Sequence, residues 1–542
     1  MCIRDRFNKE NFHKVKNSFL SGFLAIALAS LTITSPALAE KNTITIGIEA
    51  DLARLDPHIS TTWNTFKALL HMYEGFVAED LLAENVETPP IVPSLAESWE
   101  ISADKKTYTF KLREGVSFHD GEPWNAQAAK FNLDRMTNPD FEFHQPGSVG
   151  LLSWVWGDLE SYKVVNDFTF EIKLKQPNAE FLRRLSAGGS GTPRMISPAA
   201  VRKYGNDGIN TNPVGTGPFK FGEREVGVQT VLVKNSGYWD EKRVPKFERL
   251  ILRGIPEVTT RELGLLTGEL DMISTPSPDS LEYLEAQGMT MVKGPVSTIY
   301  PIWLNFREGP LKDVRVRRAM AMAIDREGMT KYLRRGTATP AYGILNYGGP
   351  GWDPEYRDFP YDPEGAKKLL AEAGYPDGFE TRLDWTMGGG GDVNTRADAE
   401  WLQRDLGRIG IRAKIELFDN GTYWDMLAKG TREGTCCMQV SWGETGFFWL
   451  DLILPTTAQP PNGFNSGYYE NPKMNELLAS ARATSSEAEM VKILHEIRDI
   501  VTNDVAFIPL YTPIQVYAMR PEVKGFVLAP QHWADYTSVY KE

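Results

Sequence analysis

Polar and apolar residues alternate in several short segments of this chain, and that period of two predicts β-strands. The alternation holds over residues 43–48, 108–113 and 168–174. A strand with one apolar and one polar face is typical of an antiparallel sheet that is covered on one side. Between the last two segments, residues 125–136 predict a helix that ends near 138–139.

The pattern changes to alternating helices and strands in the second half of the chain. Asp362, followed by a proline, predicts the N-cap and first turn of a helix, and Gly374 predicts its end. Apolar spacings of three and four predict another helix over 399–409. Gly410 ends that helix, and the alternation at 411–417 predicts a strand directly after it. Units of this kind predict a layered α/β domain.

The first 39 residues have the features of a secretory signal peptide. Basic residues precede an uncharged run at 17–39, which ends in the small-residue cleavage pattern Ala37-Leu38-Ala39. The strongly apolar part, 19–33, is shorter than the ~20 residues that a membrane-spanning helix needs. We therefore expect cleavage after Ala39 and a soluble protein in the periplasm; a membrane anchor is the alternative.

Length and charge narrow the classes of function. The mature chain is longer than one hydrophobic core normally supports, so two or three domains with clefts between them are expected. The formal net charge is −12 for the whole chain, and it becomes more negative when the basic leader is removed. That charge argues against nucleic acid and anionic membrane surfaces as partners.

The usual sequence motifs of enzymes and metal proteins do not occur. We find no nucleophile elbow, no His-Glu-x-x-His, no phosphate-binding glycine loop and no C-x-x-C. We therefore expect no catalytic residue, no cofactor and no bound metal. A glycoside hydrolase with two carboxylates stays open as an alternative, because its acids need only meet in space.

The mature chain keeps two adjacent cysteines, Cys436 and Cys437. Adjacent Cα atoms lie about 3.8 Å apart across a trans peptide, which is below the usual range for a disulfide. Two buried strand thiols are therefore expected rather than a disulfide between neighbours.

Aromatic residues are dense beside Gly, Ser, Thr and Pro, where loops are expected. Large aromatic faces with a few polar groups are how a concave site buries a small ligand. The pattern holds at Trp63, Trp154, Trp156, Tyr300, Trp303, Trp424, Trp442, Phe447, Phe448 and Trp449. All of these except Trp154, Trp156 and Phe448 are taken as candidate ligand-binding residues. The alternative for each is a place in a hydrophobic core.

Eight dispersed motifs resemble one known family in their order and spacing. They are PSLAESW at 93–99, YTFKLR at 108–113, FHDGEPWNA at 118–126, GTGPF at 215–219, LNF at 304–306, DVRVRRA at 313–319, YDPEGA at 361–366 and IPLY at 508–511. The chain resembles the family 5 extracellular solute-binding proteins over nearly its whole mature length. Members of that family bind dipeptides, oligopeptides, opines, glutathione or nickel chelates.

The resemblance implies an α/β fold like that of the type II periplasmic binding proteins, with two lobes that close about a hinge and an inserted third domain. Mapped onto this sequence, residues 40–60, 212–295 and 505–542 would form lobe I, 61–211 the inserted domain and 296–504 lobe II. The protein would act as a monomer and deliver its solute to an inner-membrane ABC permease and its ATPase.

The resemblance also points to two polar residues of the site. Peptide-binding members carry an Asp-Pro-type loop, which pairs with the peptide amine, after the second-lobe tryptophan. Here residues 441–451 read SWGETGFFWLD and lack it, which argues against an ordinary dipeptide or oligopeptide. Glu444 occupies that place and is the expected charged determinant for an amine-bearing ligand. A solvated loop glutamate is the alternative.

Asn305 is the second polar candidate, because it lies in an expected cleft-lining strand whose alternate side chains would face the ligand. The alternative is that it ties down a neighbouring loop. Together these features predict capture of a peptide or peptide-like organic solute. A metal-chelate binder of the nickel type and a secreted hydrolase with the same fold remain as alternatives.

Overall fold

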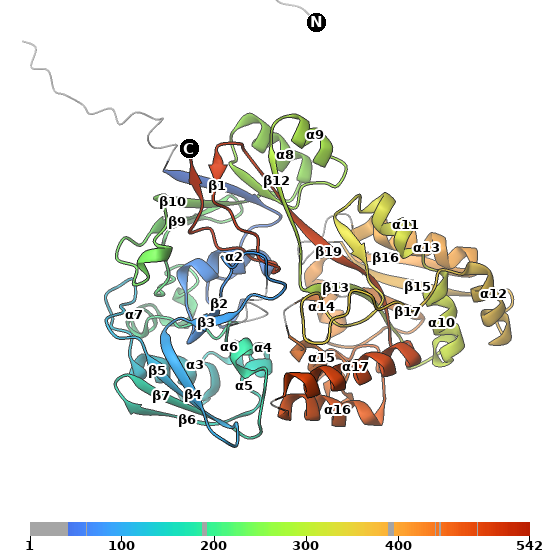
Figure 1. Ribbon diagram of the computed structural model, residues 1–542, viewed down its shortest axis with the longest axis horizontal. Helices are drawn as coiled ribbons and strands as arrows, with labels where there is room; N and C mark the ends of the chain where they lie inside the picture. The colour runs from blue at the N-terminus through green and yellow to red at the C-terminus, as the bar shows by residue number, and fades with distance from the viewer. Residues whose placement is uncertain are drawn as a thin grey trace, which may run out of the picture. The chain divides into compact units, whose positions relative to one another are not determined.

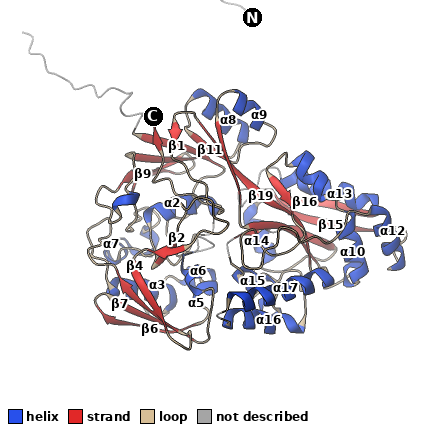
Figure 2. Ribbon diagram, in the orientation of Figure 1, coloured by secondary structure: helices blue, strands red, loops and turns tan. Residues whose placement is uncertain are grey.

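A mixed sheet of thirteen strands organises the part of the chain that the computed structural model describes (Figures 1 and 2). That part comprises residues 42–60, 62–186, 192–387, 395–439, 441–443, 446–484 and 486–542. Across the sheet, the strands run β16 (Ile411–Phe418), β15 (Phe379–Thr386), β17 (Thr435–Gln439), β13 (Thr298–Leu304), β19 (Phe507–Met519), β11 (Met272–Ser274), β1 (Thr43–Ile48), β10 (Arg249–Gly254), β9 (Gln229–Lys234) and β8 (Phe219–Glu225). Three short strands branch from this path: β12 (Thr290–Pro295) and β14 (Ala338–Pro340) pair with β19, and β18 (Trp442–Gly443) pairs with β13.

The long strand β19 joins the two halves of this sheet. Its first residues pair with β13, where Phe507 lies opposite Trp303 and Tyr511 opposite Tyr300. Its last residues pair with β12 and β11. Figure 1 shows β19 in red crossing from one group of strands to the other. The middle of β19 therefore lies where the two halves meet.

Strand β1 confirms the first predicted strand, since Ile44, Ile46 and Ile48 are fully buried. It pairs in parallel with β10 on one side and β11 on the other. A central position explains why a short apolar segment near the start of the mature chain becomes part of a core.

A separate four-stranded antiparallel sheet confirms the two other predicted strands. It consists of β4 (Ala96–Ile101), β5 (Thr107–Leu112), β7 (Thr169–Leu174) and β6 (Leu159–Asn166). The predicted helix between them is α3 (Ala126–Thr137), whose N-cap Asn125 accepts hydrogen bonds from the backbone N–H groups of Gln127 and Ala128. Its apolar face packs on Phe110 and Phe170 of the sheet in one buried cluster.

The predicted helix–strand units are also present. Helix α12 (Pro363–Glu372) begins at Asp362, whose side chain accepts from the Gly365 N–H at 2.8 Å, and Gly374 follows it with φ +96°. Helix α13 (Thr395–Arg408) is followed by Gly410, with φ +87°, and then by β16, which pairs in parallel with β15. Positive φ at both glycines is the reason the helices end there.

The remaining longer helices cover the sheets or pair with each other. They are α2 (Trp63–Met72), α7 (Pro198–Gly208), α8 (Val258–Thr267), α10 (Val314–Ala323), α14 (Asn420–Leu427), α16 (Pro472–Ala483) and α17 (Glu487–Asp504). Shorter helices include α4 (Pro146–Leu151), α5 (Ser153–Trp156), α6 (Phe181–Ser186), α9 (Leu281–Ala286), α11 (Arg326–Gly328) and α15 (Phe448–Ile453). Their apolar side chains form several separate buried clusters rather than one core. The division into two lobes and an inserted domain stays a prediction.

The prediction of two free thiols is wrong, because Cys436 and Cys437 are joined by a disulfide. The pairing of β15 with β17 passes from Arg382–Thr435 directly to Leu383–Cys437 and skips Cys436. Such a bulge breaks the alternation of side chains between the two faces of a strand. Both cysteines consequently belong to the same buried cluster, where their sulfur atoms meet.

The predicted signal peptide lies outside the described residues. Among the residues that are described, no helix has the length and apolar character required to cross a membrane.

Candidate ligand-binding site

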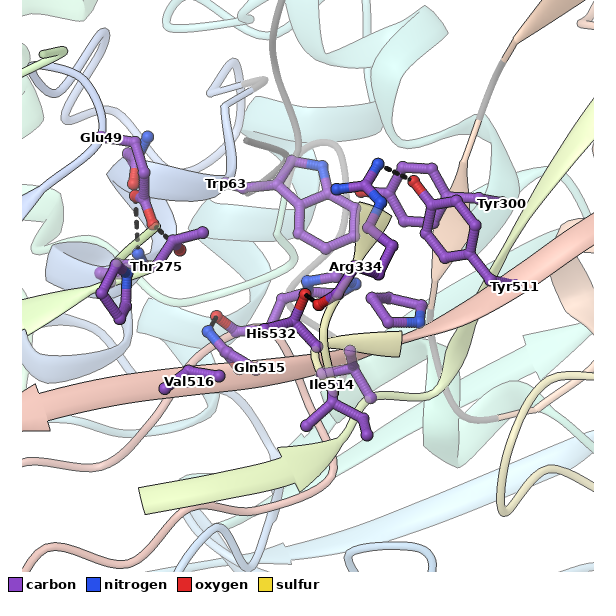
Figure 3. A pocket seen from close by; sticks show the side chains of 16 residues that line it. Glu49, Trp63, Thr275, Tyr300, Arg334, Tyr511, Ile514, Gln515, Val516 and His532 are labelled. Carbon is purple, nitrogen blue, oxygen red and sulfur yellow. Dashed lines mark hydrogen bonds and ion pairs between the residues drawn. The ribbon is translucent and has the colours of Figure 1, made fainter. Parts of the chain in front are cut away.

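A cavity lies beside the middle of β19, and residues from distant parts of the chain surround it (Figure 3). Helix α2 supplies its first turns, β13 and β19 supply one wall, and the segments after β1 and β11 supply another. The lining residues are Glu49, Trp63, Asn64, Lys67, Thr275, Pro276, Val296, Tyr300, Arg334, Thr337, Tyr511, Pro513, Ile514, Gln515, Val516 and His532.

One side of the cavity is formed by an ion pair between Glu49 and Lys67. Glu49 follows β1, and its carboxylate lies 3.0 Å from the Lys67 ammonium on α2. Lys67 also donates to the Ser274 hydroxyl at 3.2 Å, and the Thr275 hydroxyl donates to Glu49. Burial by itself would raise the pKa of Glu49, but Lys67, Thr275 and Arg261 outweigh it and lower that pKa to about 2. Glu49 is therefore a carboxylate at neutral pH.

A second charged group, Arg334, lines another part of the cavity. Its guanidinium contacts the Asp398 carboxylate and the Tyr511 hydroxyl, and it lies 4.6 Å over the Tyr511 ring. The same hydroxyl donates to Asp398 at 2.8 Å. Burial raises the pKa of Asp398, while Arg334 and Tyr511 oppose that rise. Arg334 is thus held in place by the Asp398 carboxylate of α13, which does not line the cavity.

Flat aromatic faces separate these charged groups. The rings of Tyr300 and Tyr511 stack with centroids 4.9 Å apart and planes 13° apart. The ring of Trp63 packs directly against the ring of His532, with the two planes nearly perpendicular. Figure 3 shows Trp63 between Glu49 and Arg334. A ligand in this cavity would lie against apolar rings with charged groups at its ends.

His532 is uncharged at neutral pH. Burial, and then the positive charge of Lys67, lower its pKa well below the ordinary histidine value, and Glu49 only partly opposes them. The imidazole therefore offers the cavity a neutral hydrogen-bonding group.

The structure brings two of the predicted site residues to this cavity, Trp63 and Tyr300. Three others lie in a buried cluster instead: Trp303, Phe447 and Trp449, each at most 2% exposed. Trp303 meets Phe507 edge to face, with ring centroids 5.6 Å apart. Trp424 lies on α14 and is partly buried. Its ring centroid lies 5.7 Å from that of Phe464.

Asn305 follows the end of β13 and is almost fully buried. Its side-chain N–H donates to the backbone oxygen of Thr435 at 3.0 Å, and its oxygen accepts from the Arg307 N–H at 3.0 Å. These bonds fasten β13 to the start of β17, which matches the alternative of a residue that ties down the chain. Asn305 is not among the residues that line the cavity.

The last two candidates lie in the segment 441–451. Trp442 belongs to β18, where its backbone pairs with Ile299. Glu444 lies outside the described residues, so its role in ligand choice stays a prediction. Within the described ranges, no group of three or more His, Cys, Asp or Glu side chains could hold a metal ion.

Sequence reasoning missed most of the polar residues of the cavity: Glu49, Lys67, Arg334, Gln515 and His532. One signal was present, because Lys67 is the only Lys, Arg, Asp or Glu in the helix WNTFKALLHM and stands within the apolar run Phe66 to Leu70. A lysine at a buried helix position needs a partner, and Glu49 supplies it. Single charges such as Arg334 carry no comparable signal in the sequence.

Residues 90–445 match the family model of the bacterial extracellular solute-binding proteins, family 5. The chain belongs to this family. The resemblance and the fold class inferred from the sequence are thereby confirmed.

This chain is similar to solute-binding proteins from several bacteria. The glutathione-binding protein GsiB of Salmonella typhi is 32% identical over 518 residues, covering 93% of this chain and 96% of the relative. GsiB of Pectobacterium atrosepticum is 30% identical over 514 residues, covering 94% of this chain and 95% of the relative. The ABC transporter-associated periplasmic binding protein DppA of Helicobacter pylori, solved with the peptide STSA, has a TM-score of 0.81 at 25% identity, covering 94% and 100% of the two chains.

Proposed function

We propose that this family 5 protein is the periplasmic substrate-binding subunit of an ABC importer and captures a short peptide or peptide-like solute. The cavity beside β19 supports this most directly, since an ionised carboxylate, an ammonium and a guanidinium surround aromatic walls there. A solute with an amine, a carboxylate and an apolar middle complements such a site. Short peptides have this composition.

Glutathione is the first solute to test. The relatives that cover nearly all of this chain are named as glutathione-binding. Glutathione is a tripeptide with one amine and two carboxylates, which complement the charged groups that line the cavity. In this proposal Glu49 or Glu444 faces the amine and Arg334 faces a carboxylate.

In this role the protein must be exported and its two lobes must close on the solute, but it catalyses no reaction. We propose that residues 1–39 direct export and are removed after Ala39, and that the mature protein is a monomer. Lobe I (40–60, 212–295, 505–542) and lobe II (296–504) close on the solute, and the closed form docks on the permease and its ATPase. No bond of the solute is broken by this subunit.

Native mass spectrometry of the freshly purified mature protein, followed by calorimetry with glutathione and a set of dipeptides, tests the proposal. We expect a co-purified peptide-like mass, or 1:1 binding of at least one of these probes. A stoichiometric metal in elemental analysis would favour the chelate-binding alternative. Turnover of peptide or glycoside substrates would favour a hydrolase.

A further inference from the structure

Two polar side-chain atoms at the cavity have no hydrogen-bond partner among the described residues. They are Nε2 of His532 and Oε1 of Gln515. Both residues line the cavity, and Figure 3 shows them next to each other on its wall. His532 is only 8% exposed. Nearly all buried polar atoms in folded proteins are hydrogen-bonded, so two unpaired atoms on residues that line a cavity point to a ligand.

Both side chains are held by contacts in which neither of these two atoms makes a hydrogen bond. The Gln515 amide N–H donates to the backbone oxygen of His532 at 3.2 Å, which turns the amide oxygen away from that bond. Gln515 itself is held in β19, opposite Gly294 of β12. The His532 ring is held by the contact with Trp63. A ligand would therefore meet two preorganised polar atoms.

The chemistry of the two atoms restricts what they can bind. An amide oxygen only accepts hydrogen bonds, so the ligand must place a donor at Gln515 and not a carboxylate. A ligand ammonium is disfavoured beside these atoms, because the Lys67 ammonium lines the same cavity and already pairs with Glu49. An uncharged N–H or O–H donor fits Gln515, and the neutral imidazole beside it can donate to a carbonyl oxygen; an amide group supplies both partners.

We infer that Gln515 and His532 are specificity-determining residues that recognise an uncharged amide group of the solute, with its N–H donating to Gln515 Oε1 and its carbonyl accepting from His532 Nε2. This inference rests on the proposed function, because it places a peptide bond of the solute at this wall. The charged groups of the cavity then bind the ends of the solute.

Amide-to-ester analogues of glutathione test this directly. In each of two analogues, one backbone N–H is replaced by oxygen, which removes a single donor. We expect the parent protein to bind one ester about tenfold more weakly than glutathione, because the Gln515 oxygen is then left unpaired. The Gln515→Met variant should bind glutathione more weakly than the parent by a similar factor. The variant should also bind glutathione and that ester with equal affinity. The His532→Phe variant keeps a ring against Trp63 and should bind both glutathione and that ester more weakly than the parent does.

The controls separate this inference from a structural effect and from the proposed function. Gln127→Met, at an exposed position of α3, should bind both ligands as the parent does. Equal weakening of glutathione and both esters in Gln515→Met, or no preference for the amide in the parent, would overturn the inference alone. If the parent binds neither glutathione nor any dipeptide, the proposed function fails first and the inference fails with it.

Discussion

Lys67 is the residue on which the charge of Glu49 depends. Both side chains are largely removed from water, and their carboxylate–ammonium distance is 3.0 Å. Burial of an unpaired carboxylate would be strongly unfavourable. The low pKa of Glu49, about 2, shows that the partner groups more than offset this cost. Removing Lys67 should therefore lower the stability of the fold as well as the affinity for ligand.

Lys67→Met should lower the free energy of unfolding by about 3–5 kcal/mol at pH 7, because it leaves a buried carboxylate without its cation. Glu49→Gln combined with Lys67→Met should recover most of that loss, since no charge is then buried. Urea denaturation of the two variants measures both effects. A loss below about 1 kcal/mol in the single variant would contradict the role of the pair.

His71 provides a prediction about pH. Its ring is buried, its Nδ1 bonds the Lys67 backbone oxygen at 2.8 Å, and its Nε2 accepts from the Tyr536 N–H at 3.0 Å. Burial, helped by Arg243 and Arg194, lowers its pKa to about 4, although Asp535 at 4.0 Å and the Lys67 oxygen oppose this. The unfolded chain thus binds a proton at higher pH than the folded chain does.

The stabilising effect of neutral His71 is complete above pH ~6.5 and is lost as the pH falls toward the folded pKa of about 4. His71→Gln keeps one donor and one acceptor but does not titrate. Relative to this variant, the parent should lose ~1.4 kcal/mol of unfolding free energy per pH unit in that window. Denaturation curves at several pH values measure the difference. Parallel pH profiles for the two proteins would show that His71 does not titrate as expected.

At the scale of elements, helix ends follow local rules while strand registers do not. Asn125 and Asp362 cap their helices with hydrogen bonds to N–H groups two or three residues later, so neighbouring residues suffice to predict them. The bulge at Cys436 depends instead on how β17 pairs with β15, a strand some fifty residues earlier. That is why the helix prediction succeeded and the thiol prediction failed.

Asp362→Ala should lower the free energy of unfolding by ~1 kcal/mol, because it removes the acceptor for the Gly365 N–H. Asp362→Asn keeps a capping oxygen and should lower the free energy of unfolding much less. It is the matched control. Ligand affinity should be unchanged in both variants, since Asp362 does not line the cavity. Thermal melts and calorimetry provide the two measurements. Equal costs for Ala and Asn would argue against capping.

At the scale of the whole described chain, the predicted inserted domain contacts the predicted lobe II away from the cavity. Arg184 of α6 lies 2.9 Å from Asp451 of α15, and Trp154 stacks on Phe448 with ring centroids 4.8 Å apart. The Phe447 N–H donates to Glu180 at 2.9 Å. If lobe closure forms these contacts, they stabilise the state that holds the solute.

Asp451→Asn should therefore weaken solute binding without altering the cavity. The Asp451 carboxylate is shared by Arg184 and Arg482, and loss of its charge should weaken affinity by about tenfold or more. Small-angle scattering should show a smaller radius of gyration for the parent when solute is added, and a smaller change for the variant at the same solute concentration. Unchanged affinity and compaction in the variant would remove these contacts from the closing mechanism.

The sequence by itself determined the elements whose signals are local. The alternation at 43–48, the capped helix after Asp362 and the family motifs needed only nearby residues, and together they led to the fold class and the family. Trp63 and Tyr300 were predicted from aromatic residues beside small residues, and both line the cavity, while their contact with a ligand stays a prediction.

Only the tertiary structure decided which residues share the cavity. Glu49, Arg334 and His532 are separated by hundreds of residues, and β19 and its neighbours bring them together. It also placed Trp303, Phe447 and Trp449 in a core, because an aromatic ring satisfies the same local pattern whether it packs against protein or against a ligand. Local patterns fix the backbone of an element, whereas a site depends on distances between elements that no local pattern contains.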